Sequence, residues 1–325
     1  MKYIDMHCDT IAEIFYAREN GHDSSLYENN LHIDIQKLKK GDCLVQNFAA
    51  FVNISSRKEP FKYTNELIDV YYEQLEANKE LIAPVYKFED IEKNEKAGLI
   101  SALLTVEEGQ ACEGKVENLS HFYNRGVRMM NFCWNFDNSL TTHNGINAGG
   151  LPQTEKGLTE KGFEVVEEME RLGMIIDTAH ISDKGFYDIL NHAKRPFVDS
   201  HTNSRSVFDH VRNITDDMIR KMGEKGCVAG VNFCCEFMKS YKGPEDYGAT
   251  YEVSVKHIKH LINAGGEDCV GFGSDYDGIS SLNLEMANAS FMPGFVDEMK
   301  KQGFSDDLIE KVFCKNVLRL YKEIL

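Results

Sequence analysis

The sequence contains no apolar stretch long enough to cross a bilayer. Its amino terminus runs directly into a strand-like segment, without the basic and apolar regions of a signal peptide. Basic residues are also scarce, since 36 Lys and Arg stand against 52 Asp and Glu, for a formal charge of -16. Binding to nucleic acid or to an anionic membrane is therefore disfavoured, because phosphates would be repelled. We expect a cytoplasmic protein that acts on a small molecule.

Cysteine pairs in a CxxC arrangement are missing as well. The nine cysteines are an odd number, and several lie in apolar runs where a buried thiol is usual, which favours a reduced protein without a disulfide framework. With only 6 prolines and no Pro/Gly/Ser-rich linker, nothing divides the chain. Because 325 residues, 42% of them hydrophobic, can bury one large core, we predict a single domain over residues 1–325.

Short apolar runs recur along the chain, and a longer amphipathic, charge-rich segment follows each. Eight runs are interpreted as β-strands, at residues 3–7, 44–52, 99–107, 127–134, 174–180, 197–201, 227–233 and 270–275. Helical patterns in the gaps include residues 159–172, 183–192, 215–222, 251–264 and 305–321. Alternating strands and helices indicate a parallel sheet. Eight such units, with no GxGxxG after the first strand, favour a closed (β/α)8 TIM barrel over an open doubly wound sheet.

Side chains suited to chemistry collect at the carboxyl ends of the predicted strands, where barrel active sites are built. These residues are His7, Asp9, Glu107, His180, His201 and Asp275. Imidazole and carboxylate groups suit zinc, and the two-residue step from His7 to Asp9 places both on one face of an extended segment. Glu107 has two oxygens and could bridge two ions, the second held by His180 and His201. Two ions about 3.5 Å apart would lower the pKa of a shared water.

The motifs around these residues resemble the renal (membrane) dipeptidase family, peptidase family M19, of the amidohydrolase superfamily. The resemblance runs nearly end to end. It rests on the HxD motif, on Glu107, on the spacing of His180 and His201, and on the segments SHTNSRSV, VRNITDDMI and VGFGSDYDG. It implies a zinc-dependent dipeptidase, in which a hydroxide bridging two Zn²⁺ ions attacks the peptide bond of a dipeptide with free ends. A D-residue at the carboxy-terminal position fits the family pattern, and relatives that form dimers make a homodimer an expectation by analogy.

The resemblance also implies roles in substrate binding. Arg212 matches the residue that binds the substrate carboxylate, and Asp275 matches one that contacts the amino group and is a candidate to carry a proton to the leaving nitrogen. A cation and an anion at a fixed separation would exclude longer peptides. Taken alone, Arg212 would equally suit a surface salt bridge with Asp216 or Asp217, and Asp275 would suit a helix N-cap.

Two positions depart from the family's pattern. Trp134 stands where mammalian members carry a histidine thought to polarise the carbonyl oxygen, so the indole N–H, His143 or a zinc ion alone would take that role. Glu108 follows the bridging glutamate where a small residue is common, and it either deepens the negative field or points to solvent. The adjacent Cys234 and Cys235 point to opposite faces and are not assigned as ligands.

Two other functions remain as alternatives. A different two-metal amidohydrolase, acting on another amide or ester, often carries a carbamylated lysine on the fourth strand, and residues 127–134 contain no lysine. A non-catalytic barrel would have lost a ligand, and all are present here. Residues 135–159 are rich in Asn, Gly and Thr and are predicted to form a loop. We expect this loop to shape the substrate pocket. His210 is left open, and the following histidines are expected at the surface or as helix caps: His22, His32, His121, His192, His257 and His260.

Overall fold

The computed structural model describes residues 1–239, 250–279 and 284–325. Eight parallel strands form a closed ring, because β2 pairs with both β1 and β4 and the remaining strands follow in order to β9. The strands of the ring are β1 (Tyr3–Asp5), β2 (Cys43–Phe51), β4 (Ile100–Glu107), β5 (Val127–Asn131), β6 (Ile175–Asp177), β7 (Val198–Thr202), β8 (Val228–Val231) and β9 (Val270–Phe272). The predicted TIM barrel is confirmed.

One further strand, β3 (Ile82–Pro84), was not predicted. It pairs with the first residues of β4, whereas β5 pairs with β4 further along and β2 occupies the other edge. β3 therefore lies beside the ring and extends the edge that β5 shares with β4.

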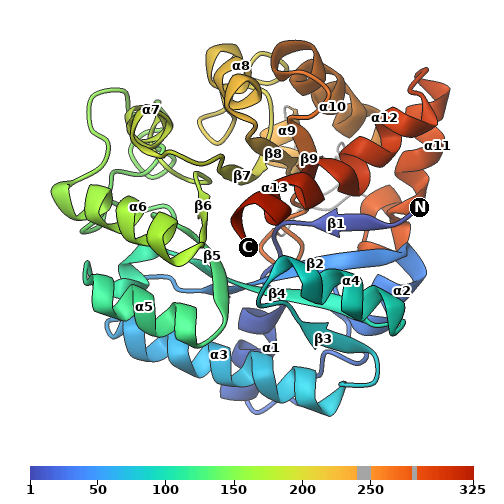
Figure 1. Cartoon of the computed structure of the whole chain (residues 1–325), viewed down its shortest axis with the longest axis horizontal. Helices are drawn as coiled ribbons and strands as arrows, with labels where there is room; N and C mark the ends of the chain where they lie inside the picture. The colour runs from blue at the N-terminus through green and yellow to red at the C-terminus, as the bar shows by residue number, and fades with distance from the viewer. Residues whose placement is uncertain (240–249, 280–283) are drawn as a thin grey trace.

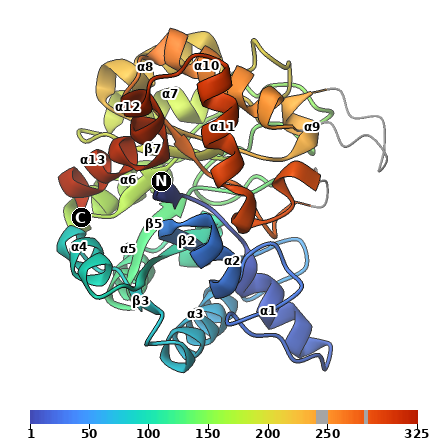
Figure 2. The ribbon, with the colours of Figure 1, turned by 90° about the vertical axis from the view of Figure 1, so that its right-hand side faces the viewer.

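Helices connect the strands and surround the barrel (Figures 1 and 2). They are α1 (Thr10–Glu19), α2 (Ile35–Gly41), α3 (Pro60–Ala77), α4 (Phe88–Lys96), α5 (Val116–Asn124), α6 (Glu160–Leu172), α7 (Asp183–His192), α8 (Asp216–Lys225), α9 (Cys235–Met238), α10 (Tyr251–Gly265), α11 (Pro293–Lys301), α12 (Asp306–Glu310) and α13 (Asn316–Ile324). Short turns lie at η1 (Gly109–Cys112), η2 (Leu284–Met286) and η3 (Ala289–Phe291), and the π-helical η4 (Lys311–Lys315) joins α12 to α13.

The five predicted helices are all present, and each begins after a hydroxyl side chain that accepts a backbone N–H of the first turn. These capping residues are Thr159, Ser182, Thr215, Thr250 and Ser305. Helix α8 continues three residues past its predicted end and stops at Gly226, whose φ of 78° suits glycine.

Two apolar clusters make up the core. The larger one packs the surrounding helices against the strands. The smaller one joins residues of seven strands to α13 and includes Ile4, Val45, Leu103, Met129, Ile175, Val198, Val228, Leu320 and Tyr321. The nine cysteines are buried, in agreement with their place in apolar runs.

His257 is a correction to the expected surface histidines, because it is fully buried in α10. Its Nδ1 accepts a hydrogen bond from the backbone N–H of Ser204 (3.1 Å), and its Nε2 lies 3.0 Å from the carbonyl oxygen of Met238. His257 is a polar residue on the buried face of α10, where it bonds to two partners outside the helix. Helical periodicity does not reveal such partners.

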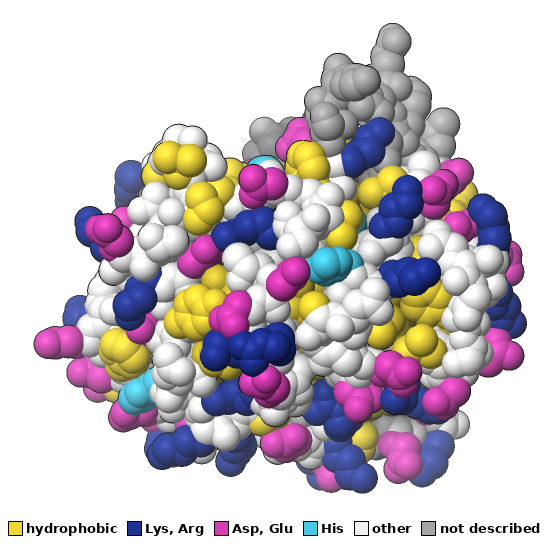
Figure 3. Space-filling model, turned by 90° about the horizontal axis from the view of Figure 1, so that it is seen from above, with side chains coloured by type: hydrophobic (Ala, Val, Ile, Leu, Met, Phe, Trp, Pro, Cys, Tyr) yellow, Lys and Arg dark blue, Asp and Glu magenta, His cyan; other side chains and the backbone are white. Residues whose placement is uncertain are grey.

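The molecular surface carries mixed charge. On the face seen in Figure 3, acidic and basic side chains are interspersed over the surface. No helix in the described part of the chain is both long and apolar enough to cross a membrane.

Candidate metal centre

Six buried side chains converge at the carboxyl ends of five strands. His7 follows β1 and Asp9 precedes α1, Glu107 ends β4, and His201 lies within β7. His180 and Asp275 come three residues after β6 and β9, with φ angles of 69° and 62° that turn the chain sharply at these points. The six residues predicted from the strand ends are thus brought together, and none is more than 8% exposed.

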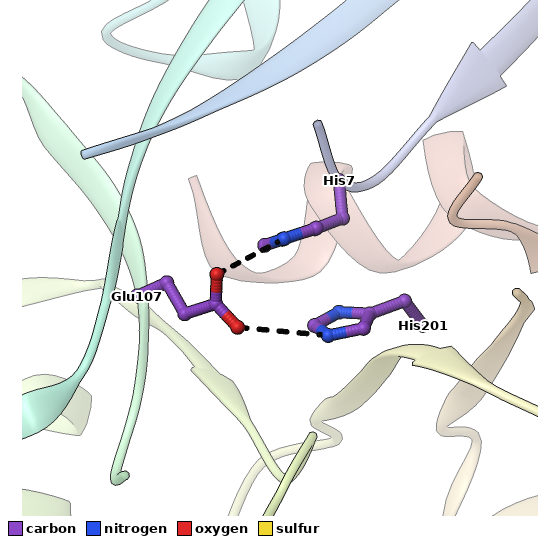
Figure 4. A group of neighbouring side chains, drawn as sticks. All are labelled: His7, Glu107 and His201. Carbon is purple, nitrogen blue, oxygen red and sulfur yellow. Dashed lines mark ion pairs between the residues drawn. The ribbon is translucent and has the colours of Figure 1, made fainter. Parts of the chain in front are cut away.

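Glu107 directs its carboxylate toward both His7 and His201, whose rings stack on one another (Figure 4). Its Oε2 is 3.3 Å from His7 Nε2, whereas its Oε1 is 3.1 Å from His180 Nε2 and 3.7 Å from His201 Nε2. The two oxygens therefore face different imidazoles. A carboxylate in this position can bind one ion through each oxygen.

The donor atoms fit metal ions better than they fit one another. His7 Nε2 and Asp9 Oδ1 are buried without a hydrogen-bond partner, and the Nε2 atoms of His180 and His201 are only 2.9 Å apart. Ligand atoms of His7, Glu107 and His201 lie within 4.8 Å of one another, as do those of His7, Asp9 and Asp275. Lone pairs and negative charges packed this closely are stabilised when a cation lies among them.

The outer nitrogens of two histidines are held by neutral oxygens. His180 Nδ1 lies 2.8 Å from Asn135 Oδ1, and His201 Nδ1 lies 2.7 Å from Ser200 Oγ. Ser200 in turn donates to Asp177 Oδ2 (2.6 Å). These bonds fix each ring with Nε2 toward Glu107. None of the three partners was predicted, because only the folded chain brings Asn135 to His180.

Burial and mutual repulsion shift the pKa values of the carboxyl groups. Burial raises the pKa of Glu107 to about 8 and that of Asp275 to about 6, with Asp9 adding to both shifts and His7 opposing them. Burial lowers the pKa of His180 and His201 well below the usual value. Burial alone would also lower the pKa of His7, but Glu107 and Asp9 raise it well above 6.5. Without bound cations, these shifts favour the protonated form of the Glu107 and Asp275 carboxyl groups.

A cavity of about 310 Å³ opens above these ligands. Asp9, Glu107, His180 and Asp275 lie in its floor, and the loop after β5 contributes Asn135 and Ile146, in agreement with the expected role of residues 135–159. Its remaining lining residues are Ala12, Glu13, Tyr16, Phe51, Trp134, Cys234, Glu236, Phe237, Asp277, Gly278 and Ile279. The described lining contains six acidic side chains and no lysine or arginine.

Trp134 and His143 occupy different places. The Trp134 ring lies in the cavity wall, 5.0 Å from the ring of Phe51 and 6.4 Å from that of His180, and its indole N–H donates no hydrogen bond within the described chain. His143 is absent from the described lining, and its Nδ1 lies 2.7 Å from Asp137 Oδ1. Of these two side chains, only Trp134 faces the cavity.

Glu108 does not point to solvent, which corrects that alternative, and it does not line the cavity. It is fully buried with a φ of 98°, and its carboxylate accepts hydrogen bonds from the backbone N–H of Gln110 and Trp134 (both 2.9 Å) and from Asn138 Nδ2. Burial raises its pKa to about 7 although these bonds oppose the shift. Glu108 thus anchors the loop that carries Trp134.

Arg212 lies in the β7–α8 connection and is only 4% exposed. Its Nη2 donates to the carbonyl oxygen of His201 (3.0 Å), and its guanidinium carbon lies 5.5 Å from the ring centroid of Phe237. The alternative surface salt bridge is not formed, because Asp216 pairs with His260 (2.7 Å) and Asp217 with Arg220.

Asp275 does not cap a helix either, since residues 276–279 form none. Its Oδ2 accepts a hydrogen bond from Asn232 Nδ2 (2.9 Å), while its Oδ1 faces His7 Nε2 at 3.8 Å. Asn232, at the end of β8, is another site residue that sequence motifs alone did not identify. The asparagine leaves one carboxylate oxygen directed toward the metal ligands.

The closed barrel and this ligand set define a metal-dependent hydrolase of the amidohydrolase type. The family model described as membrane dipeptidase (peptidase family M19) matches residues 1–325, so the chain belongs to this family. It is accordingly a metallo-dipeptidase, a hydrolase that acts on peptide bonds. The resemblance found in the sequence motifs is confirmed.

Individual relatives agree in sequence and in fold. An uncharacterised dipeptidase of Schizosaccharomyces pombe is 30% identical over 311 residues, which cover 91% of this chain and 74% of the relative. The solved structure of dipeptidase AC, a metallopeptidase of family M19, superposes with a TM-score of 0.87 at 22% identity and covers 100% of this chain and 98% of its own. A Rhodobacter sphaeroides metallopeptidase, solved with a phosphinate mimic of the dipeptide L-Ala-D-Ala, gives 0.86 at 21% identity, with 100% and 99% covered.

Proposed function

We propose that this protein is a zinc-dependent dipeptidase that hydrolyses dipeptides with both ends free. Its two Zn²⁺ ions would be held by His7, Asp9, Glu107, His180 and His201. The observation that carries the proposal is the placement of Glu107, whose two oxygens face different histidines within 3.3 Å. When bound, two such ions supply Lewis acidity and lower the pKa of a water between them.

Asp275 is the group best placed to bind the substrate's amino end and to move a proton. It lines the cavity beside the ligands, and Asn232 holds one of its oxygens while the other remains available. A carboxylate there can pair with an ammonium group. It can also take a proton from the attacking water and return it to the leaving nitrogen.

Arg212 is our candidate for the substrate's carboxylate. The main cavity offers no cation among its described lining residues, and the adjoining small cavity, which shares His180 with it, offers Arg205 and Arg212. Arg205 is already engaged by both oxygens of Asp183 at 2.8 Å. A carboxylate between His180 and Phe237 would thus be matched by Arg212, a planar fork of donors.

Trp134 is proposed as the donor that replaces the missing histidine. Its ring lies in the cavity wall next to His180, and its indole N–H donates no hydrogen bond to the residues that the structure describes. A donor in this position would stabilise negative charge on the carbonyl oxygen as the bond is attacked. A D-residue at the carboxy-terminal position is part of the proposal, supported by the L-Ala-D-Ala mimic bound to the Rhodobacter sphaeroides relative.

The proposal is tested with a panel of L-L and L-D dipeptides, together with N-acetylated and C-amidated forms of one of them. We expect cleavage of the free-ended dipeptides only, lost on treatment with a chelator and restored by zinc. Cleavage of the blocked forms at equal rates would overturn the roles of Arg212 and Asp275. If the zinc-loaded protein cleaves none of these dipeptides, its substrate must be another amide or an ester.

A further inference from the structure

A second, small cavity of about 10 Å³ lies beside His180, which also lines the main cavity. Four of the side chains that line it are almost completely buried, with exposures of 1–4%. Each has one polar atom without a hydrogen-bond partner among residues 1–239, 250–279 and 284–325, and these atoms are Asn144 Nδ2, Asp199 Oδ1, Arg212 Nε and Asn213 Oδ1. Buried polar groups in folded proteins are nearly always paired, so four such atoms around one cavity require an explanation.

The four atoms match the hydrogen-bonding capacity of one water molecule. Asn144 Nδ2 and Arg212 Nε are donors, whereas Asp199 Oδ1 and Asn213 Oδ1 are acceptors, and water accepts two hydrogen bonds and donates two. A cavity holds a water when it has room for about one probe sphere and two to four polar partners. The size and the lining of this cavity meet both conditions.

The other side-chain polar atoms of the two asparagines are already engaged. Asn213 Nδ2 donates to the carbonyl oxygens of Phe208 (2.8 Å) and Phe237 (2.7 Å). Asn144 Oδ1 accepts from the backbone N–H of Ile146 (2.9 Å). The side chains are thereby held in place, so they cannot simply rotate to pair with one another.

We propose that this cavity binds one structural water, and that Asp199 acts through this water as a positioning residue for Arg212. Among the described residues, neither Asp199 nor Arg212 forms a direct ion pair, unlike Arg205 and Asp183 on the rim of the same cavity. A bridging water would fix the Nε edge of the guanidinium, while Nη2 is fixed by the carbonyl of His201 (3.0 Å). The functional part of this inference rests on the proposed role of Arg212 in binding the substrate carboxylate.

The direct test is a crystal structure of the zinc-loaded protein at a resolution that shows ordered water. We expect density for one water within hydrogen-bond distance of at least three of the four atoms. An empty cavity, or a rearrangement in which Arg212 Nε bonds directly to a protein oxygen, would overturn the proposal. The position of a bound water does not depend on any activity, so the crystal structure tests the water site independently of the proposed function.

The kinetic test compares Asp199→Ala with Asp199→Asn. Loss of the acceptor in Asp199→Ala should raise KM for a free-ended dipeptide about tenfold while kcat and zinc content stay within twofold. Asp199→Asn keeps an oxygen acceptor and should restore most of the wild-type KM. The C-terminal amide of the same dipeptide, which lacks the carboxylate and is not expected to be cleaved, is measured as a competitive inhibitor, and its inhibition constant should show no such change.

Asp183→Asn is the matched control, because Asp183 lines the same cavity but both of its carboxylate oxygens accept hydrogen bonds from Arg205. It should leave KM near the wild-type value. Equal effects of Asp199→Ala on the acid and on the amide, or an unchanged KM for the acid, would show that Asp199 does not position Arg212. If wild-type protein cleaves no dipeptide, the proposed function fails, and the crystallographic outcome still decides the water site.

Discussion

The histidines of the metal centre are oriented by neutral groups at their outer nitrogens. Asn135 accepts from His180, and Ser200 lies between His201 and Asp177. A neutral acceptor fixes the ring without making the imidazole as basic as a direct carboxylate would. The clustering of the candidate ligands could be predicted, because they stand at strand ends in a recognisable spacing. Their partners could not, since Asn135 and Asp177 meet the histidines only through the packing of neighbouring strands.

Removal of a ligand histidine gives the first prediction. His180→Ala or His201→Ala should lower bound zinc from two ions to about one, because Glu107 would then lack one of the imidazoles beside its Oε1. Metal content after dialysis against dilute zinc measures this. His192→Ala is the control, since His192 is partly exposed and pairs only with Glu167. Two ions retained in both ligand variants would refute the assignment.

The second prediction concerns proton transfer. Asp275→Asn should retain both ions and lower kcat about 100-fold or more, because the amide can still accept from a neighbour but cannot take up a proton. Steady-state kinetics and metal analysis on the same sample check both parts. Turnover at the wild-type rate would remove Asp275 from the proton path, whereas loss of zinc would make it a ligand.

At the scale of elements, the carboxyl end of β4 contributes to the candidate metal centre and also anchors a neighbouring loop, through two adjacent residues. Glu107 points to the metal ligands, and Glu108, with its positive φ, turns away and binds the loop after β5. The barrel places both functions at one strand end. The alternation of strand and helix predicted this architecture, and hydroxyl caps marked the helix starts. The strand β3 was missed because its sequence includes Pro84, and a proline within a short apolar run argues against a strand.

The role of Glu108 can be tested separately from that of Glu107. Glu108→Ala should lower the free energy of unfolding by about 2 kcal/mol, since the buried N–H groups of Gln110 and Trp134 lose their acceptor. Because Trp134 is then less firmly held, kcat/KM should also fall. Denaturant unfolding and kinetics measure the two effects. Glu113→Ala, which removes a partner of Lys115 near the surface, is the control and should change neither.

For the whole molecule, the excess of acidic residues extends into the barrel. The carboxyl groups of Glu107, Asp275, Asp199 and Asp277 are buried, and burial raises the pKa of each, to about 8, 6, 7 and 7 respectively. In each case the folded state binds more protons than the unfolded state over the range between the two pKa values. Folding of the metal-free protein therefore loses stability as pH rises through that range.

The pH dependence of stability should consequently reveal the metal centre. Between pH 7.5 and 8.5, His180 and His201 are neutral in the fold and almost entirely neutral in the unfolded state, whose histidine pKa is about 6.5, so their depressed pKa values contribute little. Glu107, protonated below about pH 8 in the fold, must then ionise, and the Tm of chelator-treated protein should fall. Zinc at the site favours the ionised carboxylate, so the loaded protein should lose less over the same interval. Calorimetry at pH 7.5 and 8.5 measures this, with chelator-treated Glu107→Gln as the control that lacks the titrating group. If the variant and the wild type lose the same Tm, the pH dependence comes from His7, Asp199 and Asp277, and Glu107 is ionised without metal.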